Sequence, residues 1–280
     1  MKPAALGLKA IRMDILVYGY GTMAGAMVDG WLRAGMDPAR ITAYNPRPKQ
    51  VPDGVTLVTQ LPDRPFDAVV LGFKPHMLGD IAPQMGEVLR GGIALSILAG
   101  VELATLQSSL PTARGWVRFM PNLAVALGKS PNALVARGLS ETDRAQVTDL
   151  AQMLGSAEWL TDESQFELVT ALVGSGPGFV YRFIDALAAA ASDLGLAEDQ
   201  ALRLAVQMVE GAAALAAASE RSPAELARRV ASPGGMTQRG LDVLDEDAAL
   251  RELMIKCLAA ARDRGVEMGR EARNSAGKSG

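Results

Sequence analysis

The sequence predicts an α/β Rossmann-type domain, with a doubly wound and mostly parallel sheet, followed by an all-α dimerisation domain. Two observations predict this order. Up to about residue 162, short apolar segments rich in β-branched residues alternate with helix-compatible segments, which is typical of parallel sheets covered by helices. Beyond that point no strand is expected, and apolar residues recur at helical spacing over three long segments.

The first strand, turn and helix predict a dinucleotide site. Gly19, Gly21 and Ala24 follow a short apolar run in the register G-x-G-x-x-G/A. Gly19 is expected to allow a tight turn, Gly21 to let a pyrophosphate approach the backbone, and Ala24 to let the helix pack near the strand. The N-terminus of the helix offers unpaired N–H groups to phosphate. An ordinary βα turn is the alternative, because glycine turns are common.

Seven further segments are expected to be strands. The run 66–72 is continuously apolar, as in a strand that is buried on both faces. The expected strands are residues 41–45, 55–59, 66–72, 92–98 and 116–120, with late edge strands at 133–136 and 157–160. Helices are expected at residues 77–89, 103–108 and 141–154.

The second half is expected to contain three long helices, with glycine and proline breaks at residues 174–178 and 233–235. Alanine-rich segments such as residues 201–218 carry apolar surface on more than one side. A small helical domain does not readily bury that much apolar surface alone. We therefore expect a homodimer, or a higher homo-oligomer built on dimers; a self-contained bundle is the alternative.

The division of the chain follows from these patterns. Residues 1–12 are expected to form an N-terminal extension and residues 13–162 the dinucleotide-binding domain. Residues 163–273 are expected to form the helical dimerisation and substrate domain. Residues 274–280 are small and polar and are expected to form a flexible tail.

Composition excludes several classes of function. The apolar fraction of 49% supports full cores, and the net charge of −3 does not favour nucleic acid as a partner. The lone cysteine, Cys257, fits a reducing cytoplasm, and with one histidine, His76, there is no cluster typical of a metal site. No signal peptide is expected in residues 1–12, and no apolar run of membrane-spanning length.

The end of the second expected strand favours NADP. An NAD-specific site usually has a carboxylate here for the ribose 2′-hydroxyl. This chain instead has Asn45, which can donate to a phosphate, and Arg47 and Lys49, which supply positive charge. We therefore expect NADPH, with NADH as the alternative cofactor; a solvated basic turn is the structural alternative.

Other loops follow the carboxyl ends of strands, where ligands of doubly wound sheets bind. Lys74 and Pro75 follow the fourth strand and are expected near the cofactor. The adjacent His76 could donate a proton near neutrality, but a single loop histidine is more often a surface residue. The segments at residues 96–100 and 120–122 are candidates for the nicotinamide pocket.

Two glycine-rich turns lie in the helical half. The first, residues 174–178, is consistent with a helix break that places Pro177 near the start of a helix. The second, residues 232–237, has consecutive N–H groups at a Gly-Gly turn before a helix, which suits a carboxylate. A plain loop is the alternative for this second turn, and the residues alone leave the choice open.

Several of these segments occur together in one known family. They are residues 19–24, 70–75, 96–101, 118–122, 170–179 and 232–241. With them, the chain resembles pyrroline-5-carboxylate reductase from residue 13 to about residue 268. The resemblance implies a Rossmann domain, a helical dimerisation domain and an active site shared by two chains. It also implies reduction of the C=N bond of 1-pyrroline-5-carboxylate to L-proline by NADPH or NADH, in the cytoplasmic pathway of proline biosynthesis.

The patterns and the resemblance together define the expected site residues. Those expected at the cofactor are Gly19, Gly21, Thr22, Met23, Ala24, Asn45, Arg47, Lys74, Pro75, Ala99 and Gly100. Those expected at the substrate are Met120, Asn122, Ser232, Gly234, Gly235, Met236 and Thr237. By resemblance, Thr237 is the catalytic residue, and no metal is expected.

The chain departs from the usual family pattern near the substrate. Leu123 and Ala124 replace the usual Thr-Pro, and Met236 and Gln238 flank Thr237 where Thr and Ile are common. A related cyclic imine is therefore an alternative substrate.

Two rival functions remain at this level. A β-hydroxyacid dehydrogenase needs a lysine on the first long helix of its second domain, but this chain has no lysine between Lys129 and Lys256. A non-catalytic NADP-binding regulator could have kept the fold, since fold alone does not fix function.

Overall fold

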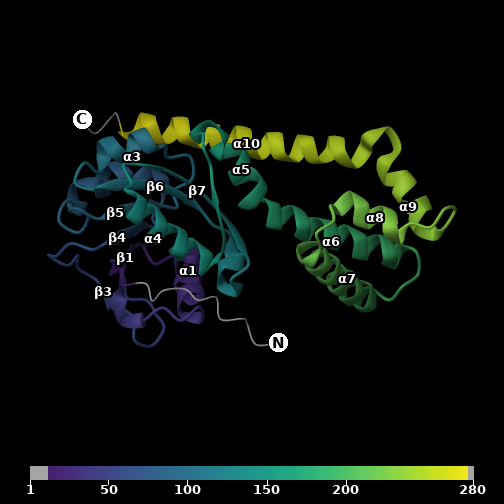
Figure 1. Cartoon of the computed structure of the whole chain (residues 1–280), viewed down its shortest axis with the longest axis horizontal. Coiled ribbons are helices and arrows are strands. Elements are labelled where there is room, and N and C mark those ends of the chain that lie inside the picture. Colours follow the sequence, from purple (N-terminus) through teal and green to yellow (C-terminus); the bar gives the residue numbers. More distant parts are fainter. Residues whose placement is uncertain (1–11, 277–280) are drawn as a thin grey trace. The chain divides into compact units, whose positions relative to one another are not determined.

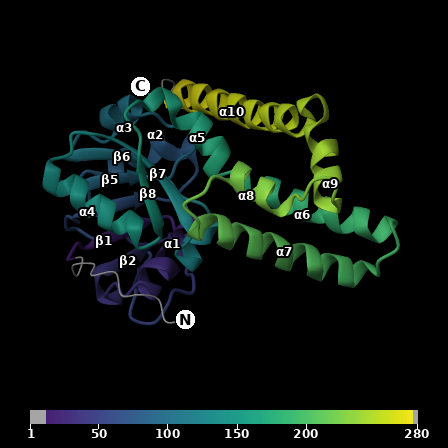
Figure 2. The ribbon, with the colours of Figure 1, turned by 45° about the vertical axis from the view of Figure 1, so that its right-hand side comes forward.

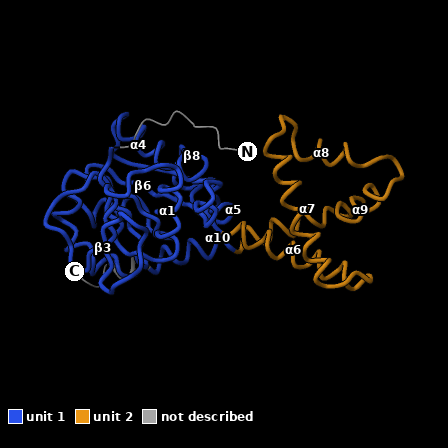
Figure 3. The backbone as a smooth tube through the Cα atoms, turned by 90° about the horizontal axis from the view of Figure 1, so that it is seen from below, with its two compact units in different colours: residues 1–174, 261–280 blue, residues 175–260 orange. Residues whose placement is uncertain are grey.

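The structure is a computed structural model that describes residues 12–276 of the 280-residue chain. It divides into two compact units (Figures 1 and 3). Unit 1 contains the residues up to Gly174 together with those from Ala261 onward, and unit 2 contains Ser175–Ala260. The expectations for residues 1–11 and 277–280 lie outside the described residues. The helix α10 continues to Ala276, so the first residues of the expected tail are helical.

Unit 1 is built on one eight-stranded sheet of order β3-β2-β1-β4-β5-β6-β7-β8. Its neighbouring strands are parallel except β6 and β7, which are antiparallel. The strands are β1 (Ile15–Tyr18), β2 (Ile41–Tyr44), β3 (Thr56–Val58), β4 (Ala68–Leu71), β5 (Ile93–Ser96), β6 (Gly115–Met120), β7 (Ser130–Arg137) and β8 (Gly155–Trp159). This confirms the predicted mostly parallel, doubly wound sheet.

The point where the strand order reverses lies between β1 and β4. The chain runs outward from β1 to β3 and then returns, so that β4 pairs with β1 on the side opposite β2. Ile15 is accordingly opposite Ile41 on one side and Ala68 on the other. The crevice outside the carboxyl ends of the strands at such a reversal is the usual ligand site of doubly wound sheets.

Strand alternation sends side chains into two separate core layers. Val17 and Val70 belong to the layer under α1 (Thr22–Arg33) and α4 (Glu141–Gln152). The other layer, which includes Leu16 and Val69, is closed by three helices. They are α2 (Leu78–Ile81), α3 (Leu103–Ser109) and α5 (Phe166–Val173). Figure 2 shows the sheet with helices packed around it. Both faces are buried, which explains the continuous apolar runs in the strands.

One expectation about a helix needs correction. The helix expected at residues 77–89 is broken into a 3₁₀ turn at Pro75–Met77, the short α2, and a second 3₁₀ turn at Ala82–Met85. Pro83 explains the break, because it has no N–H and its ring clashes with the preceding turn. By its contacts, α5 belongs to the compact unit that contains the sheet.

Unit 2 is helical throughout and has a small core of its own. It contains α6 (Gly176–Asp193), α7 (Glu198–Ala218), α8 (Pro223–Val230), α9 (Met236–Asp245) and the first part of α10 (Ala249–Ala276). Its buried cluster consists of Ala188, Ala201 and Ala205, with Ile184 and Ala191 partly buried. Large apolar side chains on the same helices are exposed, among them Val180, Phe183, Leu202, Leu204, Met208 and Leu215.

The helix α7 bears on the expectation about membranes. Within the described residues it is the one helix long and apolar enough to cross a membrane, judged by length and composition alone. The expectation that no apolar run reaches that length is therefore too strict for this helix. Because α7 packs against α6 through small alanine side chains, its composition is also that of a helix in a helical interface.

Candidate active site

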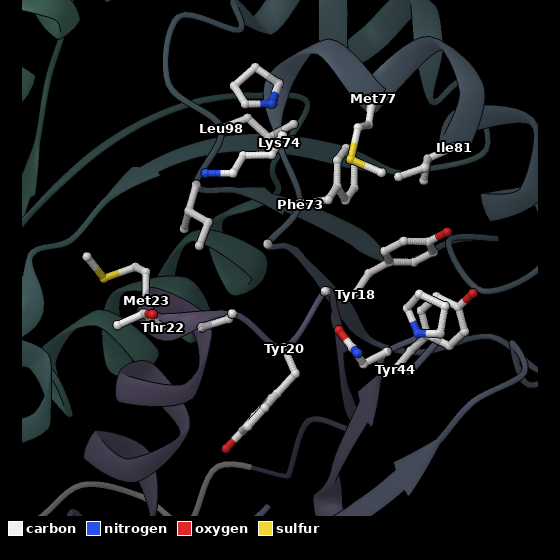
Figure 4. Close-up of a pocket in the computed structure, with 18 of the residues that line it drawn as sticks. Tyr18, Tyr20, Thr22, Met23, Tyr44, Phe73, Lys74, Met77, Ile81 and Leu98 are labelled. Carbon is white, nitrogen blue, oxygen red and sulfur yellow. The ribbon is translucent and has the colours of Figure 1, made fainter. Parts of the chain in front are cut away.

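A pocket of about 780 Å³ lies in unit 1 at the carboxyl ends of the central strands (Figure 4). All but two of the residues expected at the cofactor line it. Those on its wall are Gly19, Gly21, Thr22, Met23, Ala24, Asn45, Lys74, Pro75 and Ala99. Arg47 and Gly100 are not part of the wall. The volume is within the usual range for small-molecule and cofactor sites.

The glycine turn after β1 has the geometry that a tight βα turn requires. Gly19 has a φ of +90°, and its N–H donates to the Tyr44 carbonyl at 2.9 Å. A Cβ at Gly19 would lie 2.9 Å from backbone atoms of Gly72. A Cβ at Gly72 would in turn lie 3.2 Å from the Cβ of Ala24. The three small residues therefore let the ends of β1, β4 and α1 meet closely.

Gly21 differs from Gly19, because the protein's own packing leaves room for a side chain there. A Cβ at Gly21 would approach no protein atom closer than 3.9 Å, the distance to the Gly72 carbonyl oxygen, and its φ is negative. Gly21 nevertheless lines the pocket. The space that the missing side chain leaves is therefore open to a ligand.

The N-terminus of α1 can hold an anion in this pocket. Gly21 is the N-cap and provides no side-chain cap, and the first turn carries no acidic residue. The first helical bond runs from the Gly25 N–H to the Gly21 carbonyl, so the N–H groups of Thr22 and Met23 have no helical acceptor. These groups and the helix dipole favour a phosphate.

An aromatic wall forms another part of the pocket. The Tyr18 ring lies 4.6 Å from the Tyr44 ring and 5.4 Å from the Phe73 ring, between centroids. Figure 4 shows Tyr18 and Tyr44 side by side, with Met77 and Ile81 beyond Phe73. Burial, followed by the nearby Tyr44, raises the pKa of Tyr18 to about 12, so its phenol stays neutral even in alkaline solution. The wall suits a flat, mostly apolar ring such as adenine.

The loop after β2 brings Asn45 and Lys49 to the pocket. The Asn45 N–H donates to the Val58 carbonyl at 3.1 Å, which ties the loop to β3. The Asn45 side-chain amide donates to the Arg47 carbonyl at 2.6 Å. Arg47 is exposed and contributes nothing to the wall, whereas Lys49 does.

The loop after β4 places its two polar residues, Lys74 and His76, differently. Lys74 and Pro75 line the pocket, but the exposed His76, between Pro75 and Met77, does not. The placement agrees with the interpretation of His76 as a surface residue.

The C-terminal end of α10 completes the pocket and was missed by the sequence interpretation. Met268 lines the wall. Next to it, Gly269 lies against Gly100: a Cβ at Gly100 would be 2.6 Å from the Gly269 nitrogen. The end of α10 therefore packs against the loop after β5 at Gly100, which has a φ of +74°. The spacing of Gly265 and Gly269 was the available signal, since residues four apart lie on one face of a helix and glycine lets another backbone approach closely.

We predict that Gly269→Ala weakens both folding and cofactor binding. The new Cβ would lie 2.7 Å from the Gly100 carbonyl oxygen, so the helix end must shift and move Met268. Overpacking of this kind costs about 1–3 kcal/mol, which thermal unfolding would register, and NADPH titration should show weaker binding. Arg270→Ala, at the exposed neighbouring position, is the control. Equal Tm and NADPH affinity in wild type and Gly269→Ala would refute the supporting role.

The segment at residues 118–122 is buried and holds α5. Arg118 is 2% exposed and pairs with Glu163 at 3.2 Å and with Glu167. Its guanidinium also lies 3.9 Å from the centre of the Phe166 ring. These contacts fix α5 against the end of β6.

Met120 and Asn122, expected at the substrate, also lie near α5. Met120 belongs to the same buried cluster as Phe166 of α5, and Asn122 is hydrogen-bonded to the end of this helix. The Asn122 amide donates to the Val173 carbonyl at 3.1 Å, and its oxygen accepts from the Ala124 N–H at 2.9 Å. Neither Met120 nor Asn122 lines the pocket of unit 1. The structure therefore gives the Asn122 side chain a role in positioning the backbone.

In unit 2, residues 232–237 form the expected turn before a helix. Gly234 has a φ of +68°, and the Gly235 N–H donates to the Ser232 carbonyl at 2.9 Å. The helix α9 then begins at Met236 with Gly235 as N-cap, with no side-chain cap and no acid in its first turn. Thr237 is exposed in that first turn. The turn thus offers free N–H groups and one hydroxyl to an anionic ligand.

The fold and the pocket define a dinucleotide-dependent oxidoreductase, and no cluster of metal-ligating side chains is found in residues 12–276. The family description "Pyrroline-5-carboxylate reductase dimerisation" matches residues 163–268. The pyrroline-5-carboxylate reductase of Pseudomonas aeruginosa is 33% identical, over 91% of this chain and 96% of the relative. That of Pisum sativum is 33% identical, over 87% and 92%. The chain belongs to the pyrroline-5-carboxylate reductase family.

Solved structures agree with this assignment. The Coxiella burnetii pyrroline-5-carboxylate reductase is 31% identical and superposes with a TM-score of 0.83, over 91% of this chain and 98% of that one. The Plasmodium falciparum enzyme, solved with NADP bound, has the same fold, with a TM-score of 0.80 at 23% identity over 93% of this chain and all of that one.

Proposed function

We propose that this protein reduces the C=N bond of 1-pyrroline-5-carboxylate to form L-proline. The observation that carries the proposal is the match to pyrroline-5-carboxylate reductases over nearly the whole chain. The dinucleotide pocket and the uncapped α9 turn supply the two recognition elements that this reaction needs. The absence of lysine between Lys129 and Lys256 argues against a β-hydroxyacid dehydrogenase.

In this mechanism the nicotinamide, when bound, supplies the hydride that adds to the imine carbon. The N–H groups of Met236 and Thr237, at the start of α9, bind the substrate carboxylate. The Thr237 hydroxyl donates a hydrogen bond to the ring nitrogen. As hydride adds to the imine carbon, the electron pair of the C=N bond moves to that nitrogen, which takes the hydroxyl proton, and the exposed Thr237 regains a proton from water. The carboxylate is attached to the carbon next to that nitrogen, so one donor beside the carboxylate reaches both groups.

The cofactor residues have separate roles. Gly19, Gly21 and Ala24 shape the turn, and the N–H groups of Thr22 and Met23 bind the pyrophosphate. The aromatic wall holds the adenine. We propose NADPH as the preferred cofactor, because no carboxylate follows β2 and the loop there is basic. The same fold holds NADP in the Plasmodium falciparum enzyme. A cytoplasmic location is part of the proposal, supported by the single free cysteine.

The activity is tested by following NADPH oxidation with 1-pyrroline-5-carboxylate, other cyclic imines and a set of keto acids. We expect turnover of the cyclic imine carboxylate and none of the keto acids. Faster turnover of a different imine would assign the changes at Leu123, Ala124, Met236 and Gln238 to substrate choice. A protein that binds NADPH but reduces no imine would refute the proposed activity.

We further propose that the smallest stable unit is a homodimer built on unit 2. Its exposed apolar side chains, such as Leu215, which is 71% exposed, outnumber those of its small buried cluster. Light scattering at low micromolar concentration should give a mass of at least twice the 29.4 kDa of one chain. A monodisperse, active monomer would contradict this expectation.

A further inference from the structure

The loop after β2 contains two cations, and the structure separates them. Arg47 and Lys49 alternate with Pro46 and Pro48, and both are exposed. Neither forms an ion pair within the described part of the chain. Only Lys49 contributes to the wall of the cofactor pocket. By charge alone the two residues are equivalent, so their position must distinguish them.

The loop's own bonds restrict it. The Asn45 N–H is bound to the Val58 carbonyl, and the Asn45 amide holds the carbonyl of Arg47. Proline fixes φ near −65° at positions 46 and 48. Lys49 therefore follows a short, restrained segment that starts at the sheet.

Lys49 also lies at a junction. A shallow groove adjoins the pocket, and Tyr20, Gly21, Thr22 and Lys49 border both of them. The N-terminus of α1, which suits the pyrophosphate, is thus on one side of Lys49, and the carboxyl end of β2 is on the other. In doubly wound folds the residues that follow the second strand bind the 2′ position of the adenosine ribose, and Lys49 follows β2 in this chain. Asp29 also borders this groove, and its negative charge would repel a phosphate bound there. The positive charge of Lys49 offsets that repulsion.

We propose that Lys49, and not Arg47, binds the 2′-phosphate of NADPH and sets the preference for NADPH over NADH. The inference rests on the proposed use of NADPH. The Asn45 amide, which keeps a second N–H beyond its bond to the Arg47 carbonyl, is the neutral partner in the same subsite.

The test is equilibrium binding of NADPH and NADH, followed by the fluorescence of the reduced nicotinamide without any substrate. Lys49→Met should weaken NADPH binding by about 10-fold, the effect of one charge-assisted hydrogen bond, and change NADH binding by less than about 2-fold. Arg47→Met removes the same charge from the same loop and should change both affinities by less than about 2-fold. Lys49→Arg should keep most of the preference for NADPH.

Raising the salt concentration should reduce the NADPH preference of the wild type more than that of Lys49→Met, because the contact is between charges near solvent. Loss of preference in Arg47→Met but not in Lys49→Met would overturn the proposal. So would equal weakening of NADPH and NADH in Lys49→Met, or a wild type without preference. The binding measurement needs no imine. A protein that prefers NADPH through Lys49 but reduces no imine would therefore refute the proposed activity and leave the Lys49 proposal intact.

Discussion

Thr237→Val is expected to lower kcat for 1-pyrroline-5-carboxylate by about 10- to 100-fold while NADPH binding stays unchanged. Valine has nearly the shape of threonine but lacks the hydroxyl, so the ring nitrogen loses its donor. One hydrogen bond of this kind is worth about 1–3 kcal/mol, and each 1.4 kcal/mol is about tenfold in rate. Because Thr237 is exposed in the first turn of α9, the substitution removes no core contact.

Two further variants separate the hydroxyl from the backbone. Thr237→Ser should retain much of the activity, because it keeps the donor, and Thr237→Ala should behave like the valine variant. A Val variant with the kcat of the wild type would remove Thr237 from the chemistry. Catalysis would then depend on positioning by the loop backbone.

Gly21→Ala is expected to reduce NADPH affinity by at least about 10-fold with little effect on folding. The new methyl group would meet no protein atom closer than 3.9 Å, but it would occupy the place where the pyrophosphate approaches the backbone. Alanine at an N-cap costs about 1 kcal/mol or less, so Tm should fall by less than about 4 °C. Calorimetric titration and thermal unfolding of the same sample measure both quantities.

Gly19→Ala is the contrasting variant. Gly19 has a φ of +90°, and a Cβ at this position would lie 2.9 Å from the Gly72 backbone. We expect a loss of about 2–4 kcal/mol in the free energy of unfolding, together with weaker binding. If Gly21→Ala lost as much stability as Gly19→Ala, packing and not the pyrophosphate would explain the glycine at position 21.

Much of the fold could be predicted because local patterns and tertiary structure agree. Each expected strand is present, since β-branched runs between turns leave few alternatives in a parallel sheet. The helix at residues 77–89 was wrongly extended because apolar spacing was given more weight than Pro83. The helix α5 was not among the expected helices, because its apolar residues directly precede the glycine break at residues 174–178.

The site was only partly predictable for a geometric reason. Turn residues such as Gly19 and Ala24 are recognised by their spacing, because the pattern lies within one strand–turn–helix segment. Met268 is more than 240 positions along the chain from this turn, and no local pattern links it to the pocket. The choice between Arg47 and Lys49 likewise depends on the path of a loop with two prolines, which composition does not determine.

The position of the end of α10 has a consequence for synthesis of the chain. The sheet and its helices are complete at Gly174, but the residues that cover Gly100 and supply Met268 are in the part of unit 1 that begins at Ala261. The ribosome must make all of unit 2 in between, which takes roughly 4–20 s at bacterial or eukaryotic elongation rates. During that interval the nascent dinucleotide unit has an unfinished wall and an uncovered glycine loop. We therefore expect high-affinity capture of the cofactor only after synthesis of unit 2, whose helices form the proposed dimer interface.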